Sequence, residues 1–190
     1  MAVVESTDLP HLGGNMDHND LETFTTTVWD YVIDKFKIKS ALDLGSGYGF
    51  SSQYFFDKSV ATVAVDGLEQ NVYNAVYPTV LHDLTKGPFC TQVDLVHCQE
   101  VVEHIEEKYL DNLLKSMACG KYILMTNALP GQLGYHHVNL QNTEYWIEHL
   151  KTYGFEFMEA ESMYIRGLAK ANMNPYMAKT GSLFINQKTL

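Results

Sequence analysis

The feature that most constrains this chain is the segment at residues 41–49, which reads Ala-Leu-Asp-Leu-Gly-Ser-Gly-Tyr-Gly. An apolar lead that is typical of a strand runs into a glycine-rich turn, and residues 50–56 continue with a spacing that suits a helix. Gly45 and Gly47 allow the backbone to turn sharply and to come close to a ligand. The helix that follows directs its free N–H groups at the same place. The segment therefore predicts a strand, a turn and a helix that cradle a nucleotide.

Asp43 stands two residues before this turn and narrows the kind of nucleotide. Dinucleotide sites usually read Gly-x-Gly-x-x-Gly and need no acid at this position. An acid here suits a ligand with a cationic end, such as the ammonium of a methionine-derived group. The run Asp-x-Gly-x-Gly-x-Gly at residues 43–49 resembles the first motif of the class I S-adenosylmethionine (SAM)-dependent methyltransferases. A glycine turn in another α/β protein is the alternative interpretation.

The rest of the sequence predicts alternating strands and helices. Apolar residues at helical spacing predict a helix that Asp20 caps and that extends to residue 36. Residues 167–181 show no clear helix, which suits a final antiparallel hairpin. We therefore expect a Rossmann-like α/β fold with a seven-stranded, mostly parallel sheet, an antiparallel last strand and helices on both faces. The predicted strands are residues 41–45, 60–65, 79–81, 93–97, 121–126, 155–165 (straight or bent) and 182–186, and the later predicted helices are residues 106–117 and 143–152.

The length of 190 residues predicts one domain, residues 1–190. Within it, residues 1–40 are expected to form an N-terminal lid and helix, and residues 41–190 the SAM-binding α/β core. The 3 cysteines have no metal-ligand spacing and are interpreted as reduced thiols. No basic region followed by a long apolar run opens the sequence, and no apolar run approaches the ~20 residues of a membrane span. We therefore expect a cytoplasmic protein without a membrane span.

The charge balance argues against a nucleic-acid partner. The formal net charge is −10, with 13 Lys and Arg against 23 Asp and Glu. Phosphate backbones are bound chiefly by Lys and Arg, so the affinity for RNA or DNA is expected to be weak. A small molecule or a glycan is the expected methyl acceptor.

Four strand ends predict where SAM lies, because ligands of open parallel sheets sit beyond the carboxyl ends of the strands. Asp66 ends the second strand and is expected to accept both ribose hydroxyls, although an Asp66-Gly67 pair is also a common turn. The resemblance implies that Asp83 pairs with the adenine amino group and that Leu84 packs on the ring. Capping of the next segment is the alternative for Asp83. The expected cofactor-binding residues are Asp43, Gly45, Ser46, Gly47, Asp66, Gly67, Asp83, Leu84 and Gln99.

A group of acids follows the fourth strand, where residues 99–104 read Gln-Glu-Val-Val-Glu-His. In a helical turn Glu100, Glu103 and His104 would share one face. Two carboxylates and an imidazole can hold a divalent ion such as Mg²⁺ or Mn²⁺. A similar Glu-x-x-Glu-His run occurs in ubiquinone-biosynthesis O-methyltransferases and in small-RNA 2′-O-methyltransferases, and this resemblance implies a metal that grips a substrate hydroxyl. Residues that line the pocket or cap a helix without a metal are the alternative.

The loop at residues 127–142 carries two adjacent histidines, His136 and His137, at the same end of the predicted sheet. One of them can complete the metal site or act as a general base near neutral pH. A structural histidine bonded to the loop backbone is the alternative for either. The expected catalytic residues are Glu100, His104, His136 and His137, and the expected metal ligands are Glu100, Glu103, His104 and His136.

Together these motifs resemble small stand-alone methyltransferase domains of environmental and viral sequences. They predict a SAM-dependent methyltransferase that acts on an oxygen of a small molecule or glycan, with or without a metal. The alternatives are a SAM-binding module or partner subunit without its own turnover, an RNA 2′-O-methyltransferase and a nicotinamide-dependent oxidoreductase. The acids and histidines argue against the first of these, the net charge against the second and Asp43 against the third.

Overall fold

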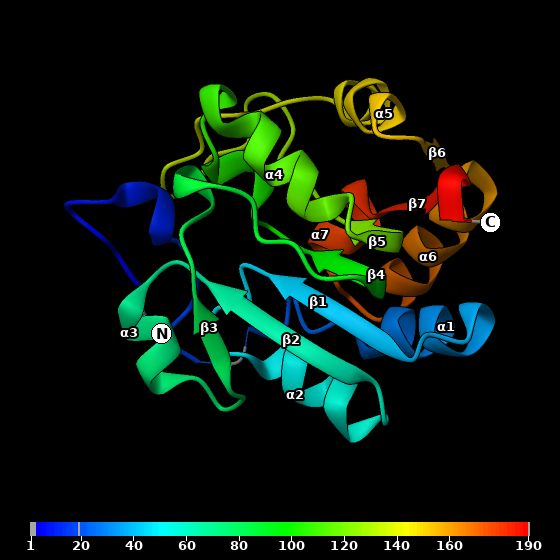
Figure 1. The fold of residues 1–190 in the computed structure, drawn as a ribbon, viewed down its shortest axis with the longest axis horizontal. Helices are drawn as coiled ribbons and strands as arrows, with labels where there is room; N and C mark the ends of the chain where they lie inside the picture. The colour runs from blue at the N-terminus through cyan, green and yellow to red at the C-terminus, as the bar shows by residue number, and fades with distance from the viewer. Residues whose placement is uncertain (1–2, 19, 190) are drawn as a thin grey trace.

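The computed structural model describes residues 3–18 and 20–189. Over these residues the chain forms one seven-stranded sheet with helices on both faces (Figure 1). The strands are β1 (Ser40–Leu44), β2 (Ala61–Asp66), β3 (Thr79–Leu81), β4 (Val93–Cys98), β5 (Gly120–Met125), β6 (Phe155–Phe157) and β7 (Ser182–Asn186). The α-helices are α1 (Thr26–Phe36), α2 (Phe50–Asp57), α3 (Glu69–Asn74), α4 (Leu110–Met117), α5 (Thr143–Thr152), α6 (Glu159–Ala171) and α7 (Pro175–Thr180). Short 3₁₀ helices are η1 (Pro10–Leu12), η2 (Leu84–Lys86), η3 (Val102–His104), η4 (Glu107–Tyr109) and η5 (Gln187–Thr189).

The strand order of the sheet is β3-β2-β1-β4-β5-β7-β6. Neighbouring strands from β3 to β5 pair in parallel, whereas β7 pairs antiparallel with both β5 and β6. The predicted sheet with an antiparallel last strand is therefore confirmed. The chain order reverses between β1 and β4, and this reversal opens a crevice beyond the carboxyl ends of these two strands.

Two apolar cores hold the helices against the sheet. On one face α4 and α5 contribute Leu113 and Trp146, both fully buried. On the other face α1, α2 and α6 contribute Trp29, Phe55 and Ile165. Burying side chains of this size on both faces stabilises each by roughly 1.5–3 kcal/mol, which explains why the strands read as apolar runs in the sequence.

The segment between β5 and β7 differs from the prediction. Residues 155–165, expected as a strand, form only the short strand β6 before α6 begins. The buried face of α6 carries Ser162, Ile165 and Ala169 at helical spacing, so small side chains mark most of it. Residues 167–181, expected without a helix, contain the end of α6 and all of α7. Both expectations are wrong.

Two helices also begin later than predicted. Asp20 does not cap α1, which begins at Thr26; its Oδ1 instead accepts a hydrogen bond from the Glu22 amide at 2.9 Å in a separate turn. The helix expected from residue 106 is preceded by η4, and α4 proper begins at Leu110.

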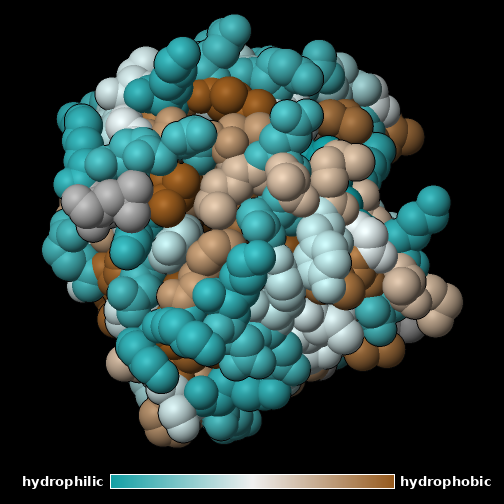
Figure 2. Space-filling model, turned by 90° about the vertical axis from the view of Figure 1, so that its right-hand side faces the viewer, coloured by the Kyte–Doolittle hydropathy of each residue, from teal (hydrophilic) through white to brown (hydrophobic). Residues whose placement is uncertain are grey.

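Two segments that surround the crevice are named here for later use. The N-terminal strap is residues 3–16, drawn in dark blue at the left of Figure 1, and the histidine loop is residues 127–142, between β5 and α5. The opposite side of the molecule, at the right of Figure 1, is mostly covered by hydrophilic side chains with smaller apolar patches between them (Figure 2). Among the described residues, no helix has the length and apolar character needed to cross a membrane.

Candidate active site

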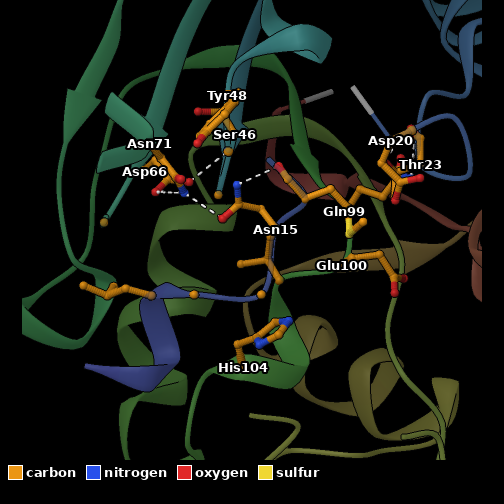
Figure 3. A pocket seen from close by; sticks show the side chains of 18 of the residues that line it. Asn15, Asp20, Thr23, Ser46, Tyr48, Asp66, Asn71, Gln99, Glu100 and His104 are labelled. Carbon is orange, nitrogen blue, oxygen red and sulfur yellow. Dashed lines mark hydrogen bonds between the residues drawn. The ribbon is translucent and has the colours of Figure 1, made fainter. Parts of the chain in front are cut away.

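A cavity of about 370 Å³ lies beyond the carboxyl ends of β1, β2 and β4. Its walls come from the glycine turn, the strand ends, the N-terminal strap and the histidine loop. Figure 3 shows Ser46, Asp66 and Asn71 at one end of it and Glu100 with Asp20 at the other. Every residue predicted to bind the cofactor lines this cavity, namely Asp43, Gly45, Ser46, Gly47, Asp66, Gly67, Asp83, Leu84 and Gln99.

The glycine turn folds tightly back onto the sheet. The amides of Gly45 and Ser46 both donate to the Val65 carbonyl, at 2.9 and 3.0 Å. Gly45 has a φ of +68°, and a Cβ at this position would lie 2.5 Å from Cγ2 of Val101. Gly47 has a φ of +56°. The turn therefore requires glycine at both positions, at Gly45 for space as well as for its backbone angle.

Asp66 is held in a fixed direction at the end of β2. Its carboxylate accepts hydrogen bonds from the amides of Gly47 (2.8 Å) and Leu68 (2.9 Å) and from Nδ2 of Asn71 (3.0 Å). Burial raises the pKa of Asp66 to about 6, despite these donors. The hydrogen bond from the Leu68 amide stabilises the turn after β2, which is the alternative that the sequence offered for Asp66. The hydrogen bond from Gly47 also ties Asp66 to the glycine turn.

Asp83 caps η2 and contacts the strap. Its Oδ1 accepts from the amide of Thr85 at 2.8 Å and lies 3.2 Å from Nε2 of His11. Burial alone would raise the pKa of Asp83, but the hydrogen bonds from Thr85 and His11 outweigh it and lower the pKa. Leu84 beside it is buried. The capping alternative for Asp83 is thus observed, and its carboxylate still faces the cavity.

Asp43 lies beneath the glycine turn, almost fully buried. Oδ1 is 2.7 Å from Nδ1 of His97 on the neighbouring β4, and Oδ2 accepts from the hydroxyls of Ser51 and Ser52, each at 2.6 Å. Burial would raise the pKa of Asp43, but His97 and the two hydroxyls outweigh it and lower the pKa. Gln99 continues this network, because its Oε1 is 3.3 Å from Nε2 of His97. The acid of the motif therefore ties β1, β4 and the start of α2 together.

Two residues predicted as catalytic, His104 and His137, and one predicted as a metal ligand, Glu103, meet at the other side of the cavity. One ligand atom from each of Glu103, His104 and His137 lies within 4.8 Å of the other two. Glu103 is fully buried, and within residues 3–18 and 20–189 neither of its carboxylate oxygens, nor Nδ1 of His104, has a partner that meets hydrogen-bond geometry. Buried polar atoms without partners are uncommon, so this cluster is a candidate site for a ligand, a proton or an ion.

Burial shifts the pKa values in this cluster toward the neutral forms. It raises the pKa of Glu103 well above its ordinary value, and the negative charge of Glu100 adds to the effect. Burial also lowers the pKa of His104 to about 4, with a smaller contribution from the neighbouring His137 and His136. His104 is therefore an uncharged imidazole at neutral pH, with a lone pair available.

The structure selects among the predicted residues. Glu100 has a φ of +53° and is not part of a helical turn, so the shared face expected for Glu100, Glu103 and His104 does not form. Glu100 lines the cavity outside the three-residue cluster, and burial raises its pKa. His137 joins the cluster, whereas His136, with a φ of +47°, neither joins it nor lines the cavity.

Several cavity residues were not predicted from the sequence. Asn71 is buried in α3 with its Oδ1 unpartnered, and Asn15 of the strap accepts a hydrogen bond from Asn71 Nδ2 at 3.0 Å. The five-residue spacing from Asp66 was the available signal for Asn71. The sequence also carried a signal for His97, because His97 and Asp43 occupy paired positions on the adjacent strands β4 and β1. Asn15 had no local signal, since its partners lie far away in the sequence.

Comparison with known proteins supports the motif reading. A comparison with curated protein sequences finds no match. Residues 42–125 match a family model described as a methyltransferase domain. This range begins in β1 and ends with β5, so it holds the glycine turn, Asp66, Asp83 and the Glu103-His104 pair.

Several solved structures with the same fold are described as methyltransferases. The methyltransferase domain of bacterial CtHen1-C has a TM-score of 0.57 and 19% identity, covering 73% of this chain and 87% of that one. A SAM dependent methyltransferase from Archaeoglobus fulgidus has a TM-score of 0.58 and 18% identity, covering 88% and 93%. The plantazolicin methyltransferase BpumL, solved with a triazolic desmethylPZN analog and SAH, has a TM-score of 0.53 and 17% identity, covering 87% and 83%. At these sequence identities, the structural similarity shows a shared fold.

The motif, the sheet order and the family match all point to the same part of the chain. The family model describes a methyltransferase domain, and one of the solved structures with this fold is a SAM dependent methyltransferase. The match over residues 42–125, the glycine motif and the sheet order together support a class I SAM-dependent methyltransferase domain, an enzyme of the transferase class.

Proposed function

We propose that this enzyme transfers the SAM methyl group to a hydroxyl oxygen of an uncharged small molecule or glycan. The observation that carries the proposal is the cluster of Glu103, His104 and His137 beside the cofactor cavity. A hydroxyl is a poor nucleophile until its proton is removed or stabilised elsewhere. The cluster supplies groups that accept a proton or hold a cation at the place where the acceptor would enter.

SAM is proposed to lie with its adenosine at the Asp66 end of the cavity. The carboxylate of Asp66 would receive the ribose hydroxyls, while Asp83 and Leu84 would contact the adenine. The hydroxyl of Ser46 is buried in the glycine turn without a hydrogen-bond partner in the part of the chain that the structure describes, so it would be available to the ligand. The methionine part would then point toward Gln99 and bring the sulfonium near the cluster. Asp43 would act on its ammonium through the His97 and Ser51 network.

The donor set of the cluster fits a divalent cation such as Mg²⁺ or Mn²⁺. An ionised carboxylate that is fully buried is costly unless a proton or a cation meets it, and the charged group that acts on Glu103 is another carboxyl group, that of Glu100. Glu103, His104 and His137 would hold the ion, and Glu100 would lie beside them. When bound, such an ion would lower the pKa of an acceptor hydroxyl.

When no ion is bound, His137 is suited to take the proton of the acceptor. Its Nδ1 is 3.2 Å from the carbonyl oxygen of Gln132, which can only accept, so Nδ1 carries the hydrogen. Nε2 then keeps its lone pair for a proton or a cation. The acceptor oxygen would attack the methyl carbon in line with the sulfur, the C–S bond would break, and SAM would leave as S-adenosylhomocysteine (SAH). Holding the two reactants in this line is the main contribution of the cavity walls.

The charge of the acceptor side favours an uncharged substrate. Tyr176 lines the cavity there, and burial raises its pKa, with further contributions from Glu22, Glu100 and Asp20. Three carboxyl groups near one phenol repel a phosphate and accept hydrogen bonds from hydroxyls. This supports a neutral polyhydroxylated acceptor over RNA.

Labelled methyl transfer tests the proposal. The purified enzyme would be incubated with methyl-labelled SAM and Mn²⁺ against hydroxylated small molecules, oligosaccharides and RNA, with SAH formation as a second readout. We expect label on an oxygen of a neutral acceptor and its loss in His137→Ala, with Glu106→Gln, an exposed surface change, as the matched control. Transfer only to nitrogen, to carbon or to RNA would contradict the proposed acceptor class.

A further inference from the structure

The N-terminal strap lies directly on the residues proposed to bind the adenosine. Nε2 of His11 is 3.2 Å from Oδ1 of Asp83, where the adenine amino group is expected. Oδ1 of Asn15 accepts from Nδ2 of Asn71, the residue that also bonds Asp66. Figure 3 shows Asn15 reaching across the cavity from the strap toward Asn71. A nucleoside that enters this end of the cavity must therefore move the strap or press against it.

The other end of the strap is fastened to the histidine loop through Tyr135. The Tyr135 hydroxyl accepts from the amide of Ser6 at 2.9 Å and donates to the Ser6 carbonyl at 3.0 Å. The strap is folded back on itself between these two ends, since the amide of Val4 donates to the Asn15 carbonyl at 2.8 Å. Ser6 and Asn15 therefore belong to one hydrogen-bonded unit that contacts both the nucleoside end and the loop.

Tyr135 is in turn close to the catalytic cluster. It precedes His137 by two residues, and the left-handed turn at His136 lies between them. The strap also reaches the cluster directly, because a Cβ at Gly14 would lie 2.7 Å from Cε1 of His104. A shift of the strap is thus passed both to the loop that carries His137 and to the ring of His104.

We propose that Tyr135 is a positioning residue through which an occupied SAM site sets the position of His137. The inference rests on the proposed function, because it takes the Asp66 end as the adenosine site and the cluster as the acceptor site. SAM that settles the strap would hold Ser6 against Tyr135 and so order the loop at residues 131–138. The acceptor would then meet a complete cluster only after SAM is bound, and binding would be ordered.

Hydrogen exchange with SAH as the probe tests this coupling. SAH would be added to the wild-type enzyme, to Tyr135→Phe and to Tyr153→Phe, and amide exchange would be followed in the strap and in residues 131–138. Tyr153→Phe is the matched control, because it removes an exposed hydroxyl bonded to Asp111 at 2.5 Å and touches neither segment. Ser6→Pro, which removes the amide donor from the other side, is the second variant should Tyr135→Phe fail to fold.

In the wild type and in Tyr153→Phe, SAH is expected to slow exchange in both segments, by about fivefold or more, the usual size of a coupling between sites. In Tyr135→Phe and Ser6→Pro, SAH should still slow exchange in the strap but leave residues 131–138 nearly unchanged. Equal protection of these residues in the variants and the wild type would overturn the coupling while leaving the proposed function intact. Failure of SAH to bind the wild type would overturn both.

Discussion

The backbone amide of Gly47 donates a hydrogen bond to Oδ2 of Asp66 at 2.8 Å, which joins the glycine turn after β1 to the end of β2. Oδ1 of the same carboxylate is bound by the Leu68 amide and by Asn71. The direction of the carboxylate is therefore set by the fold before any ligand enters. A site that is ordered in advance loses less entropy on binding.

We expect SAH affinity to fall as the pH drops through about 6. Burial raises the pKa of Asp66 to about 6, and its protonation removes an acceptor for the ribose hydroxyls. SAH favours the ionised carboxylate, so the affinity rises with pH through this range and then levels off. Calorimetry at a series of pH values measures the profile. Asp66→Asn should bind SAH more weakly by roughly 1.5–3 kcal/mol and show a flat profile; a profile unchanged from the wild type would speak against this role.

The same pKa shift predicts the sign of a stability change. The folded chain holds the Asp66 proton more tightly than the unfolded chain, whose value is near 3.8, so this residue lowers the free energy of unfolding as the pH rises from there to about 6. Urea denaturation of the wild type and Asp66→Asn across this range would show it. A steeper loss of stability in the variant than in the wild type would be the opposite of this expectation.

Gly45→Ala should destabilise the protein more than Gly47→Ala. Both substitutions place an L-residue at a positive φ, which costs about 1–2 kcal/mol. At Gly45 the new Cβ also meets Val101 at 2.5 Å, whereas at Gly47 the nearest atom is Cβ of Asn15 at 3.6 Å. Overpacking of this kind adds about 1–3 kcal/mol. Equal free energies of unfolding for the two variants in urea would contradict the packing argument.

Glu103→Gln should abolish the response of the protein to metal. The substitution removes the carboxyl group of the cluster and keeps the size of the side chain. Mn²⁺ at a hundred times its dissociation constant should stabilise the wild type by about 2.7 kcal/mol, and a chelator should reverse it. Thermal melts with Mn²⁺ and with EDTA measure both effects. Glu106→Gln, at an exposed pair with Lys108, serves as the control and should keep the Mn²⁺ response.

His137→Ala should lose activity by roughly 10²–10⁴-fold, whereas His136→Ala should stay close to the wild type. The first removes a member of the cluster, and the second removes a side chain that lies outside it. The measurement is the rate of SAH formation once an acceptor is found, with SAH affinity as a check that the cofactor site is intact. Comparable losses in both variants would show that the loop, and not one histidine, carries the effect.

The cofactor half of the fold was predictable because its signals are local and agree with each other. Gly45 and Asp66 each stand at the end of an apolar run, and parallel strands bring such ends to one edge of a sheet. The helix α6 was missed for a physical reason. Met163 and Tyr164 are 61% and 53% exposed, while the buried face is marked by the small Ser162. Large apolar side chains therefore lie on the exposed face of α6, and the apolar pattern of this segment does not mark the buried face.

The catalytic side was predictable in kind but not in detail. The acids after β4 and the paired histidines indicated a polar cluster, and the structure brings Glu103 together with His137. Which histidine turns inward depends on the backbone at His136, and a positive φ at a residue other than glycine has no reliable sequence signal. The contact of Tyr135 with Ser6 joins positions 129 residues apart, so only the tertiary structure shows it.

The place of β7 in the sheet has a consequence for how the enzyme is made on the ribosome. β7 is translated after the other six strands, yet it lies between β5 and β6. Until it emerges, a nascent chain can assemble β1 to β5 but exposes the edge of β5, and β6 has no partner in the described sheet except β7. Open strand edges invite wrong pairing. Chaperone binding to the nascent chain should therefore persist until residues 182–186 have left the exit tunnel.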